Sequence, residues 1–249
     1  MTHAIRIHRS TLAAALLLGL TTTAPAGEED EYARQRMLLM EEVDALVAET
    51  RAETGTEALS PRVSEAMRRV PRHRYVPEDQ VRHAYQNRPL PIGYGQTISQ
   101  PYIVAIMTDL MQVQPGDRVF ELGTGSGYQA AVLGELAAEV YTIEIVEPLA
   151  ERAARTLKAQ GYENVTVRAG DGYYGWEEHA PFDAIIVTAA ASHVPPPLIQ
   201  QLAPGGRMVI PLGTSFMTQH LMLVEKDEDG RVRTREVLPV MFVPLTGGH

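Results

Sequence analysis

Cysteine is absent from the 249 residues of the sequence. Disulfide bonds, thiolate metal sites and a cysteine nucleophile are therefore excluded, and cysteine usage gives no indication of the redox compartment. The histidines show no spacing typical of metal ligands, so we expect no bound metal ion.

Clustered positive charge is also absent. The sequence has 22 Lys and Arg against 31 Asp and Glu, for a net charge of −9, and it contains no run of five or more basic residues. Because the binding of nucleic-acid phosphates requires clustered Lys and Arg, we expect no nucleic-acid partner.

No apolar run is long enough to cross a bilayer as a stable helix. The most apolar stretch, residues 12–20, follows Arg6 and Arg9 and precedes the small residues 24–26. This order is typical of an export signal, so we expect residues 1–26 to be a cleavable leader that leaves no membrane span. The protein would then be periplasmic or secreted. The alternative is a disordered or interfacial extension of a cytoplasmic protein.

The most informative stretch of the chain is residues 119–127, Val-Phe-Glu-Leu-Gly-Thr-Gly-Ser-Gly. A β-branched and aromatic run ends at Glu121, and glycines follow at alternate positions, Gly123, Gly125 and Gly127. An apolar-periodic helix comes next, so the stretch predicts the first strand, turn and helix of an open parallel α/β sheet. Glycines in such a turn permit positive φ angles and the close approach of a ligand to the main chain.

The acid ahead of this turn favours one class of ligand. Dinucleotide folds carry G-x-G-x-x-G, which places a pyrophosphate on the helix N-terminus, whereas here the third glycine comes one residue early. A carboxylate at Glu121 suits a cationic ligand end, such as the amino group of S-adenosyl-L-methionine (AdoMet), better than a pyrophosphate. The turn alone leaves another nucleotide or a structural turn as alternatives.

Two later strands also end in acids. The strand predicted over residues 140–144 ends at Glu144, where a carboxylate can accept hydrogen bonds from ribose hydroxyls. The strand over residues 165–167 leads to Asp171, which is placed for an adenine amino group. A solvated strand end is the alternative for Glu144. Because parallel strands share one carboxyl edge, we expect Glu121 and these two acids to face one crevice.

The alternation of strand and helix patterns predicts the fold class. Residues 182–188 read as a further buried strand, and Asp229-Gly230 between two apolar runs predicts a hairpin turn. We expect an α/β, doubly wound and mostly parallel sheet of the AdoMet-methyltransferase Rossmann-like type, with helices on both faces and an antiparallel C-terminal hairpin. Residues 27–249 should form a single methyltransferase domain, with N-terminal helices and a substrate loop over 27–115 and the cofactor-binding sheet over 116–249.

Residues 71–102 carry proline- and glycine-marked stretches with little regular period. Long loops in compact domains are usually functional or disordered, and the aromatic and apolar content here argues against disorder. The loop leads into a helix that starts near Ser99. Serine at such a position is most often a helix cap, so capping is the first interpretation of Ser99 from the residues alone.

Taken together, these segments resemble one known family, the protein-L-isoaspartate O-methyltransferases. The resemblance extends from about residue 34 to residue 247 and leaves only the N-terminal extension outside. The Thr-Ile-Ser-x-Pro sequence at residues 97–101 is what separates this family from other AdoMet methyltransferases. The leader departs from the family, whose members usually act in the cytoplasm, where AdoMet is made. The most specific matching segments are residues 91–93, 96–101, 121–129, 170–172, 182–188 and 242–246.

The resemblance implies an activity. Members methylate, with AdoMet, the free α-carboxyl of L-isoaspartyl residues in damaged proteins or peptides, and the ester then closes to a succinimide, which initiates repair. A carboxylate with a reference pKa of about 4 is already ionised at neutral pH, so this reaction requires no general base. Two alternatives stay open: an AdoMet methyltransferase acting on another carboxylate or a small molecule, and a non-catalytic exported binding protein. We expect a monomer.

The resemblance also implies a role for each matching residue. Ser99 would be the catalytic residue, its hydroxyl orienting the substrate carboxylate. Glu121 would hold the methionine end of AdoMet and Glu144 its ribose, while Asp171 and Gly172 would meet the adenine. The other implied cofactor contacts are Gln96, Thr97, Ile98, Gly123, Gly125, Gly127 and Thr246, with Thr188 as a further candidate for the same pocket.

Overall fold

The computed structural model describes residues 26–214 and 218–248. Apart from Ala26, the leader expected over residues 1–26 lies outside this part of the chain. In the described residues, no helix combines the length and the apolar character that crossing a membrane would require.

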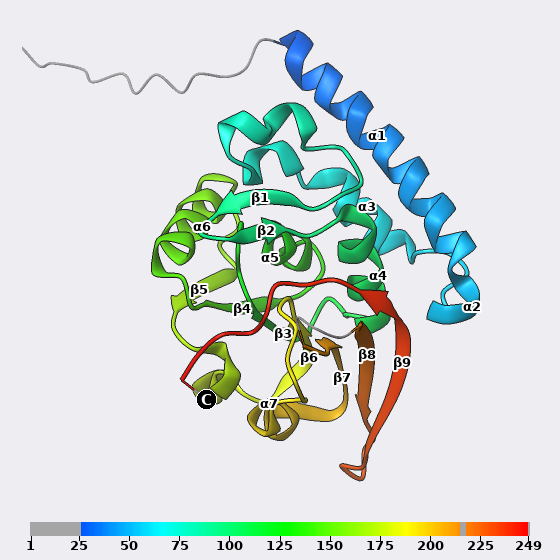
Figure 1. Ribbon diagram of the computed structural model, residues 1–249, viewed down its shortest axis with the longest axis vertical. Coiled ribbons are helices and arrows are strands. Elements are labelled where there is room, and N and C mark those ends of the chain that lie inside the picture. The colour runs from blue at the N-terminus through cyan, green and yellow to red at the C-terminus, as the bar shows by residue number, and fades with distance from the viewer. Residues whose placement is uncertain (1–25, 215–217, 249) are drawn as a thin grey trace, which may run out of the picture.

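A seven-stranded sheet forms the centre of the molecule, in the order β5-β4-β3-β6-β7-β8-β9 (Figure 1). Strands β3 to β7 pair in parallel, whereas β7 with β8 and β8 with β9 are antiparallel. The predicted fold class, including the antiparallel C-terminal hairpin, is confirmed. The strands are β3 (Arg118–Leu122), β4 (Glu139–Glu144), β5 (Val165–Ala169), β6 (Phe182–Val187), β7 (Leu202–Leu212), β8 (Gln219–Lys226) and β9 (Val232–Val240).

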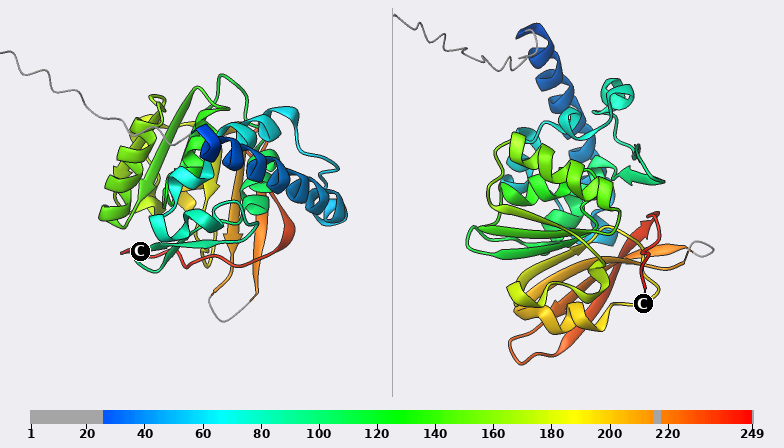
Figure 2. Two further views of the ribbon diagram at one scale, coloured as in Figure 1. Left: turned by 90° about the horizontal axis from the view of Figure 1, so that it is seen from above. Right: turned by 90° about the vertical axis from the view of Figure 1, so that its left-hand side faces the viewer.

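Helices cover the two faces of this sheet unequally (Figure 2). Side chains alternate along a strand, so neighbours such as Val119 and Phe120 on β3 belong to different apolar clusters, one on each face. The first cluster packs beneath α4 (Pro101–Met111), α5 (Tyr128–Gly134) and α6 (Glu147–Ala159). The remaining helices are α1 (Ala26–Glu49), α2 (Arg51–Thr54) and α3 (Pro61–Arg69) on the first side, and α7 (Pro196–Gln201) with the short 3₁₀ turns η3 (Gly172–Tyr174) and η4 (Glu177–His179) on the second.

The order of the strands fixes where a ligand can enter. From β3 the chain steps outward through β4 and β5, then returns to the other side of β3 to form β6. In open α/β sheets this reversal leaves a crevice at the carboxyl ends of the central strands. The crevice here lies at the ends of β3, β4 and β6.

The stretch expected to be irregular contains a small antiparallel hairpin, β1 (Leu90–Gly93) and β2 (Gln96–Ile98), preceded by the 3₁₀ segments η1 (Arg72–Tyr75) and η2 (Glu78–His83). Tyr94 and Gly95 make the turn, with φ angles of 54° and 73°. Strands this short give no readable alternation, which is why the sequence did not indicate them. The hairpin lies above the carboxyl edge of the main sheet (Figure 1).

Candidate active site

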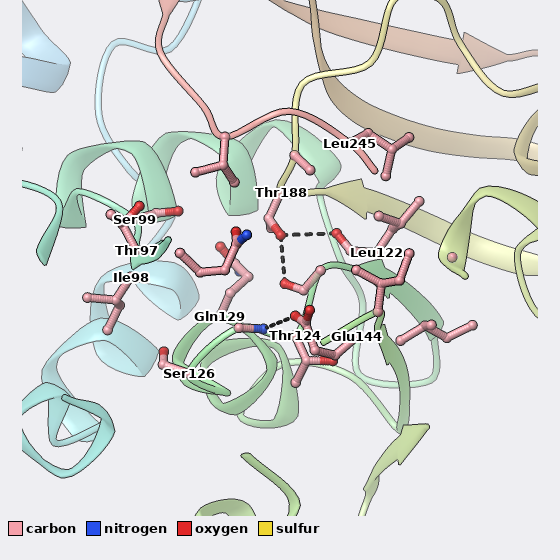
Figure 3. A pocket seen from close by; sticks show the side chains of 18 of the residues that line it. Thr97, Ile98, Ser99, Leu122, Thr124, Ser126, Gln129, Glu144, Thr188 and Leu245 are labelled. Atoms are coloured by element: carbon pink, nitrogen blue, oxygen red, sulfur yellow. Dashed lines mark hydrogen bonds between the residues drawn. The ribbon is translucent and has the colours of Figure 1, made fainter. Parts of the chain in front are cut away.

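A cavity of about 760 Å³, its open mouth included, lies between the β1–β2 hairpin and the carboxyl ends of β3, β4 and β6. The start of α5 and the C-terminal segment 243–246 complete its walls. Ser99 and Thr97 lie on one side of the cavity and Glu144 and Leu122 on the other (Figure 3). The crevice that the strand order predicts is therefore a formed cavity.

The glycine turn after β3 has a backbone that only glycine adopts readily. Gly123, Gly125 and Gly127 have φ angles of 97°, 54° and 86°. A Cβ atom on Gly123 would also overlap the Oγ1 atom of Thr188 at the end of β6. Because the first glycine lacks a side chain, the main chain of the turn can approach β6 and form the floor of the cavity.

Thr188 holds the two central strands together at this point. Its hydroxyl lies 3.0 Å from the carbonyl oxygen of Leu122 and 2.6 Å from that of Gly123, and it donates to this pair (Figure 3). Both carbonyls sit at the end of β3, where the parallel ladder stops. The Leu122 carbonyl also accepts from the amide N–H of Thr188 at 2.9 Å, so the hydroxyl adds a second hydrogen bond there and supplies a donor to the Gly123 carbonyl.

Glu144, the last residue of β4, is fixed in the cavity wall. One carboxylate oxygen accepts from the amide N–H of Gly125 at 2.8 Å, and the other accepts from that of Val146 at 2.9 Å. The side chain is buried but lines the cavity. Each carboxylate oxygen has more than one acceptor site, so Glu144 can still accept hydrogen bonds from a ligand.

Glu121 is fully buried in β3, and neither of its oxygens accepts a hydrogen bond within the described residues. Its pKa is raised to about 8: burial is the main cause, the neighbouring Thr142 hydroxyl opposes the rise in part, and the charge of Glu144 adds to it. That hydroxyl is paired with Thr124 at 2.6 Å. Glu121 does not itself line the cavity; it lies behind the turn that does.

Asp171 has a local role at the end of β5. Its Oδ1 atom accepts from the amide N–H of Tyr173 at 3.0 Å, and its Oδ2 atom accepts from that of Gly248 at 3.2 Å. It therefore caps η3 and ties the C-terminal segment to the sheet. Gly172 lines the cavity instead, and a Cβ atom there would lie 2.5 Å from the Cγ atom of Leu122.

Ser99 is not the cap of the helix that follows it. Gln100 is the N-cap residue of α4, and the amide N–H of Tyr102 in its first turn donates to Oδ1 of Asn87 at 3.0 Å. The half-buried Ser99 side chain lines the cavity, and its hydroxyl makes no hydrogen bond to any described residue. Capping of this helix is therefore not the role of Ser99, and its hydroxyl faces the cavity.

A groove of about 940 Å³, its open side included, adjoins the cavity and shares Ser99, Thr97, Thr188 and Val243 with it. Its lining includes Met241, which is 91% exposed, and Ile103 on α4. None of the described residues that line the groove is charged. Ser99 thus stands where the cavity, with Glu144 in its wall, meets an uncharged groove.

A family model described as protein-L-isoaspartate(D-aspartate) O-methyltransferase (PCMT) matches residues 41–249. The chain belongs to this family. It is 68% identical over 209 residues to protein-L-isoaspartate O-methyltransferase 2 of Polaromonas sp. strain JS666, covering 84% of this chain and 99% of that protein. It is 62% identical over 238 residues to protein-L-isoaspartate O-methyltransferase 1 of Cupriavidus necator, covering 96% and 92%.

Solved structures agree with this assignment. A protein-L-isoaspartate O-methyltransferase superposes with a TM-score of 0.74 at 27% identity, covering 85% of this chain and 66% of that one. A Plasmodium falciparum structure described as a β-aspartate methyltransferase (PCMT) in complex with S-adenosyl-L-homocysteine superposes with a TM-score of 0.69 at 26% identity, covering 84% and 96%. The fold of the family therefore accounts for nearly the whole described chain.

The cavity brings together most of the residues that the sequence pointed to, from segments far apart along the chain. Glu121, Gly127 and Asp171 lie next to it without lining it. The predicted residues that line it are Gln96, Thr97, Ile98, Ser99, Gly123, Gly125, Glu144, Gly172, Thr188 and Thr246.

Several polar and apolar lining residues were not predicted as site residues, among them Ser126, Gln129 and Ile145. Ser126 directly follows Gly125, Ile145 directly follows Glu144, and Gln129 comes two residues after Gly127, so the only available signal was their position next to predicted residues. Gln129 is held by a hydrogen bond from its Nε2 atom to the hydroxyl of Thr108 at 2.9 Å. Ile145 is 41% exposed at the cavity mouth.

Replacing Thr188 with valine tests the junction between β3 and β6. The change removes the hydroxyl but keeps the size and shape of the side chain. Because a hydrogen bond to a buried acceptor contributes about 1 kcal/mol, we expect the free energy of unfolding in urea to fall by about that amount. Thr166, exposed on β5, provides the control: Thr166→Val should leave stability unchanged or slightly increased. A Thr188→Val protein as stable as the parent would contradict this role.

Proposed function

We propose that the protein transfers a methyl group from AdoMet to the free α-carboxyl of L-isoaspartyl residues in damaged proteins and peptides. The observation that carries the proposal is the Ser99 hydroxyl, which has no partner among the described residues and stands at the junction of the cavity that Glu144 lines and the uncharged groove. Membership of the protein-L-isoaspartate O-methyltransferase family supports it.

The residues of the cavity fit AdoMet on chemical grounds. The buried carboxyl of Glu121 has no hydrogen-bond partner in the described structure, and a cationic amino group beyond the glycine turn would stabilise its ionised form. Glu144 keeps acceptor capacity for ribose hydroxyls, and Ile145 offers an apolar contact for the adenine. Gly172 lets a flat ring approach the main chain, since a Cβ there has no room. Bound AdoMet supplies an electrophilic methyl group.

The chain's own contribution is to hold and orient the second reactant. A carboxylate is ionised at neutral pH, so no residue has to remove a proton from it. The Ser99 hydroxyl donates a hydrogen bond to one carboxylate oxygen and turns the other toward the cavity. Uncharged groove walls around Thr97 and Thr188 neither pair with nor repel the carboxylate, and they exclude water around it. Positioning of this kind can account for much of the rate of a transfer between two bound partners.

The decisive assay is methyl transfer from labelled AdoMet to an isoaspartyl peptide and to its normal aspartyl twin. We expect label on the isoaspartyl peptide only, in an ester that is lost in mild base. Label on both peptides would favour a methyltransferase for carboxylates in general. If AdoMet binds and neither peptide is labelled, the small-molecule methyltransferase or the binding protein becomes the better account.

We further propose that residues 1–26 are removed on export and that residues 27–249 act as a monomeric single domain with no nucleic-acid partner. The basic, apolar and small-residue order of the leader and the acidic composition support this. N-terminal sequencing of the protein from the periplasmic fraction or the medium, with its mass by light scattering, tests both parts. An uncleaved cytoplasmic protein would instead agree with the place where AdoMet is made.

A further inference from the structure

Arg72 is the largest fully buried side chain of the described structure. It begins η1, outside the cavity, and it does not line the cavity or the groove. No carboxylate of the described residues forms an ion pair with it, and its Nη1 atom has no hydrogen-bond partner there. A buried cation without an acid is costly, so its contacts call for an explanation.

Those contacts are to main-chain carbonyls and to an aromatic ring. The Nε atom donates to the carbonyl of Ala84 at 2.9 Å, and Nη2 donates to the carbonyl of Ser99 at 2.7 Å. The guanidinium carbon lies 4.8 Å from the ring centre of Tyr128, the first residue of α5. Burial lowers the pKa of Arg72 to about 10, so the group stays charged at neutral pH and all its hydrogen bonds are charge-assisted.

The two carbonyls mark the ends of one segment. Between Ala84 and Ser99 lies the β1–β2 hairpin, whose residues cover the cavity. One guanidinium therefore holds the two ends of residues 84–99 together and fixes the main chain of Ser99. The rigid fork of arginine can reach two carbonyls at once, whereas an ammonium at the end of a lysine chain cannot reproduce that geometry.

We infer that Arg72 is a positioning residue for methyl transfer: by bridging the carbonyls of Ala84 and Ser99 against the ring of Tyr128, it sets the Ser99 hydroxyl where the substrate carboxylate is held. This inference rests on the proposed function of Ser99. Arg72 touches neither reactant and acts through the Ser99 main chain. Its effect should therefore appear in turnover much more than in AdoMet binding.

A double-mutant cycle separates this role from general stabilisation. Arg72→Lys keeps the charge and removes the fork, and it is compared with Ser99→Ala and with the double variant. We expect Arg72→Lys alone to lower kcat about 30-fold, with the AdoMet dissociation constant and the peptide KM changed less than about three-fold, since small misplacements of a reacting group are costly. In the Ser99→Ala background the same substitution should change kcat less than about two-fold.

Arg62 offers a matched control. Its guanidinium also bridges two main-chain carbonyls, those of Val113 and Leu136, both at 2.6 Å, but away from the cavity. Arg62→Lys should lower the unfolding midpoint without changing kcat at a temperature where the protein is folded. Equal losses of kcat from Arg72→Lys with and without the Ser99 hydroxyl would overturn the inference. A parent protein inactive on isoaspartyl peptides would instead overturn the proposed function.

The parent protein supplies a second test if Arg72→Lys does not fold. Side-chain ¹⁵N NMR should give slowly exchanging guanidinium signals for Arg72, because its donors are buried and bonded. With S-adenosyl-L-homocysteine present, adding the isoaspartyl peptide should shift the Nη2 signal, and adding the aspartyl twin should not. Signals that stay fixed at saturating isoaspartyl peptide would overturn the inference.

Discussion

Replacing Ser99 with alanine is expected to lower kcat for the isoaspartyl peptide by about 100-fold, because the carboxylate loses the donor that orients it. The AdoMet dissociation constant should change less than about two-fold, since the hydroxyl lies on the groove side of the cavity, away from Glu144. The fold should be retained. The hydroxyl is half-buried and bonded to no described residue, so its removal leaves no unsatisfied partner behind.

Three measurements make this result interpretable: turnover with labelled AdoMet, the AdoMet dissociation constant by calorimetry, and the unfolding midpoint. Ser64→Ala, on α3 and outside the cavity, is the matched control and should leave all three near the parent values. A Ser99→Ala protein with unchanged turnover would show that the hydroxyl does not orient the substrate. A large loss of AdoMet affinity would place the hydroxyl in the cofactor site instead.

The parallel part of the sheet could be predicted because β3, β4 and β5 carry β-branched and apolar residues and end at an acid or just before a glycine. The strand ends also located the cavity, since parallel strands share a carboxyl edge. The orientation of each acid was harder to predict. Along β3, Phe120 and Leu122 point to one face and Val119 and Glu121 to the other, so Leu122 lines the cavity and Glu121 lies behind it. A sequence specifies that alternation but not which face will hold the ligand.

Other site features depend on contacts between distant segments. Arg72 donates a hydrogen bond to the main-chain carbonyl of Ser99. Every residue has such a carbonyl, so this contact cannot be recognised from residue type. Thr188 meets the carbonyls of the glycine turn only because β6 returns beside β3. The family resemblance pointed to Thr188 without giving this reason. The sequence therefore indicated which residues belong to the site more readily than it indicated the contacts that hold them in position.

The buried acid of β3 connects cofactor binding with stability. The pKa of Glu121 rises from its ordinary value of 4.5 in the unfolded chain to about 8 in the fold, so the folded protein keeps this proton through neutral pH while the unfolded chain has lost it. The unfolded state then binds fewer protons than the native state. The contribution of Glu121 to stability is fully present below pH 4.5 and is lost as pH rises through about 8.

Glu121→Gln should therefore produce two opposite effects. Without AdoMet, the variant should be more stable than the parent by about 3 kcal/mol at neutral pH, and the difference should shrink toward zero as pH falls to about 4.5. AdoMet affinity should fall about 100-fold, since a charged interaction worth about 2–3 kcal/mol is lost.

Urea unfolding across this pH range and calorimetric titration of AdoMet measure the two effects, and the exposed Glu163→Gln is the control for removing a surface charge. AdoMet binding to the parent below pH 8 should also release a proton, because a cation near the turn favours the ionised carboxyl. A variant that is stabilised but binds AdoMet with parental affinity would show that Glu121 affects the stability of the sheet and does not contribute to AdoMet binding. In that case Glu144 would be the acid that holds the cofactor.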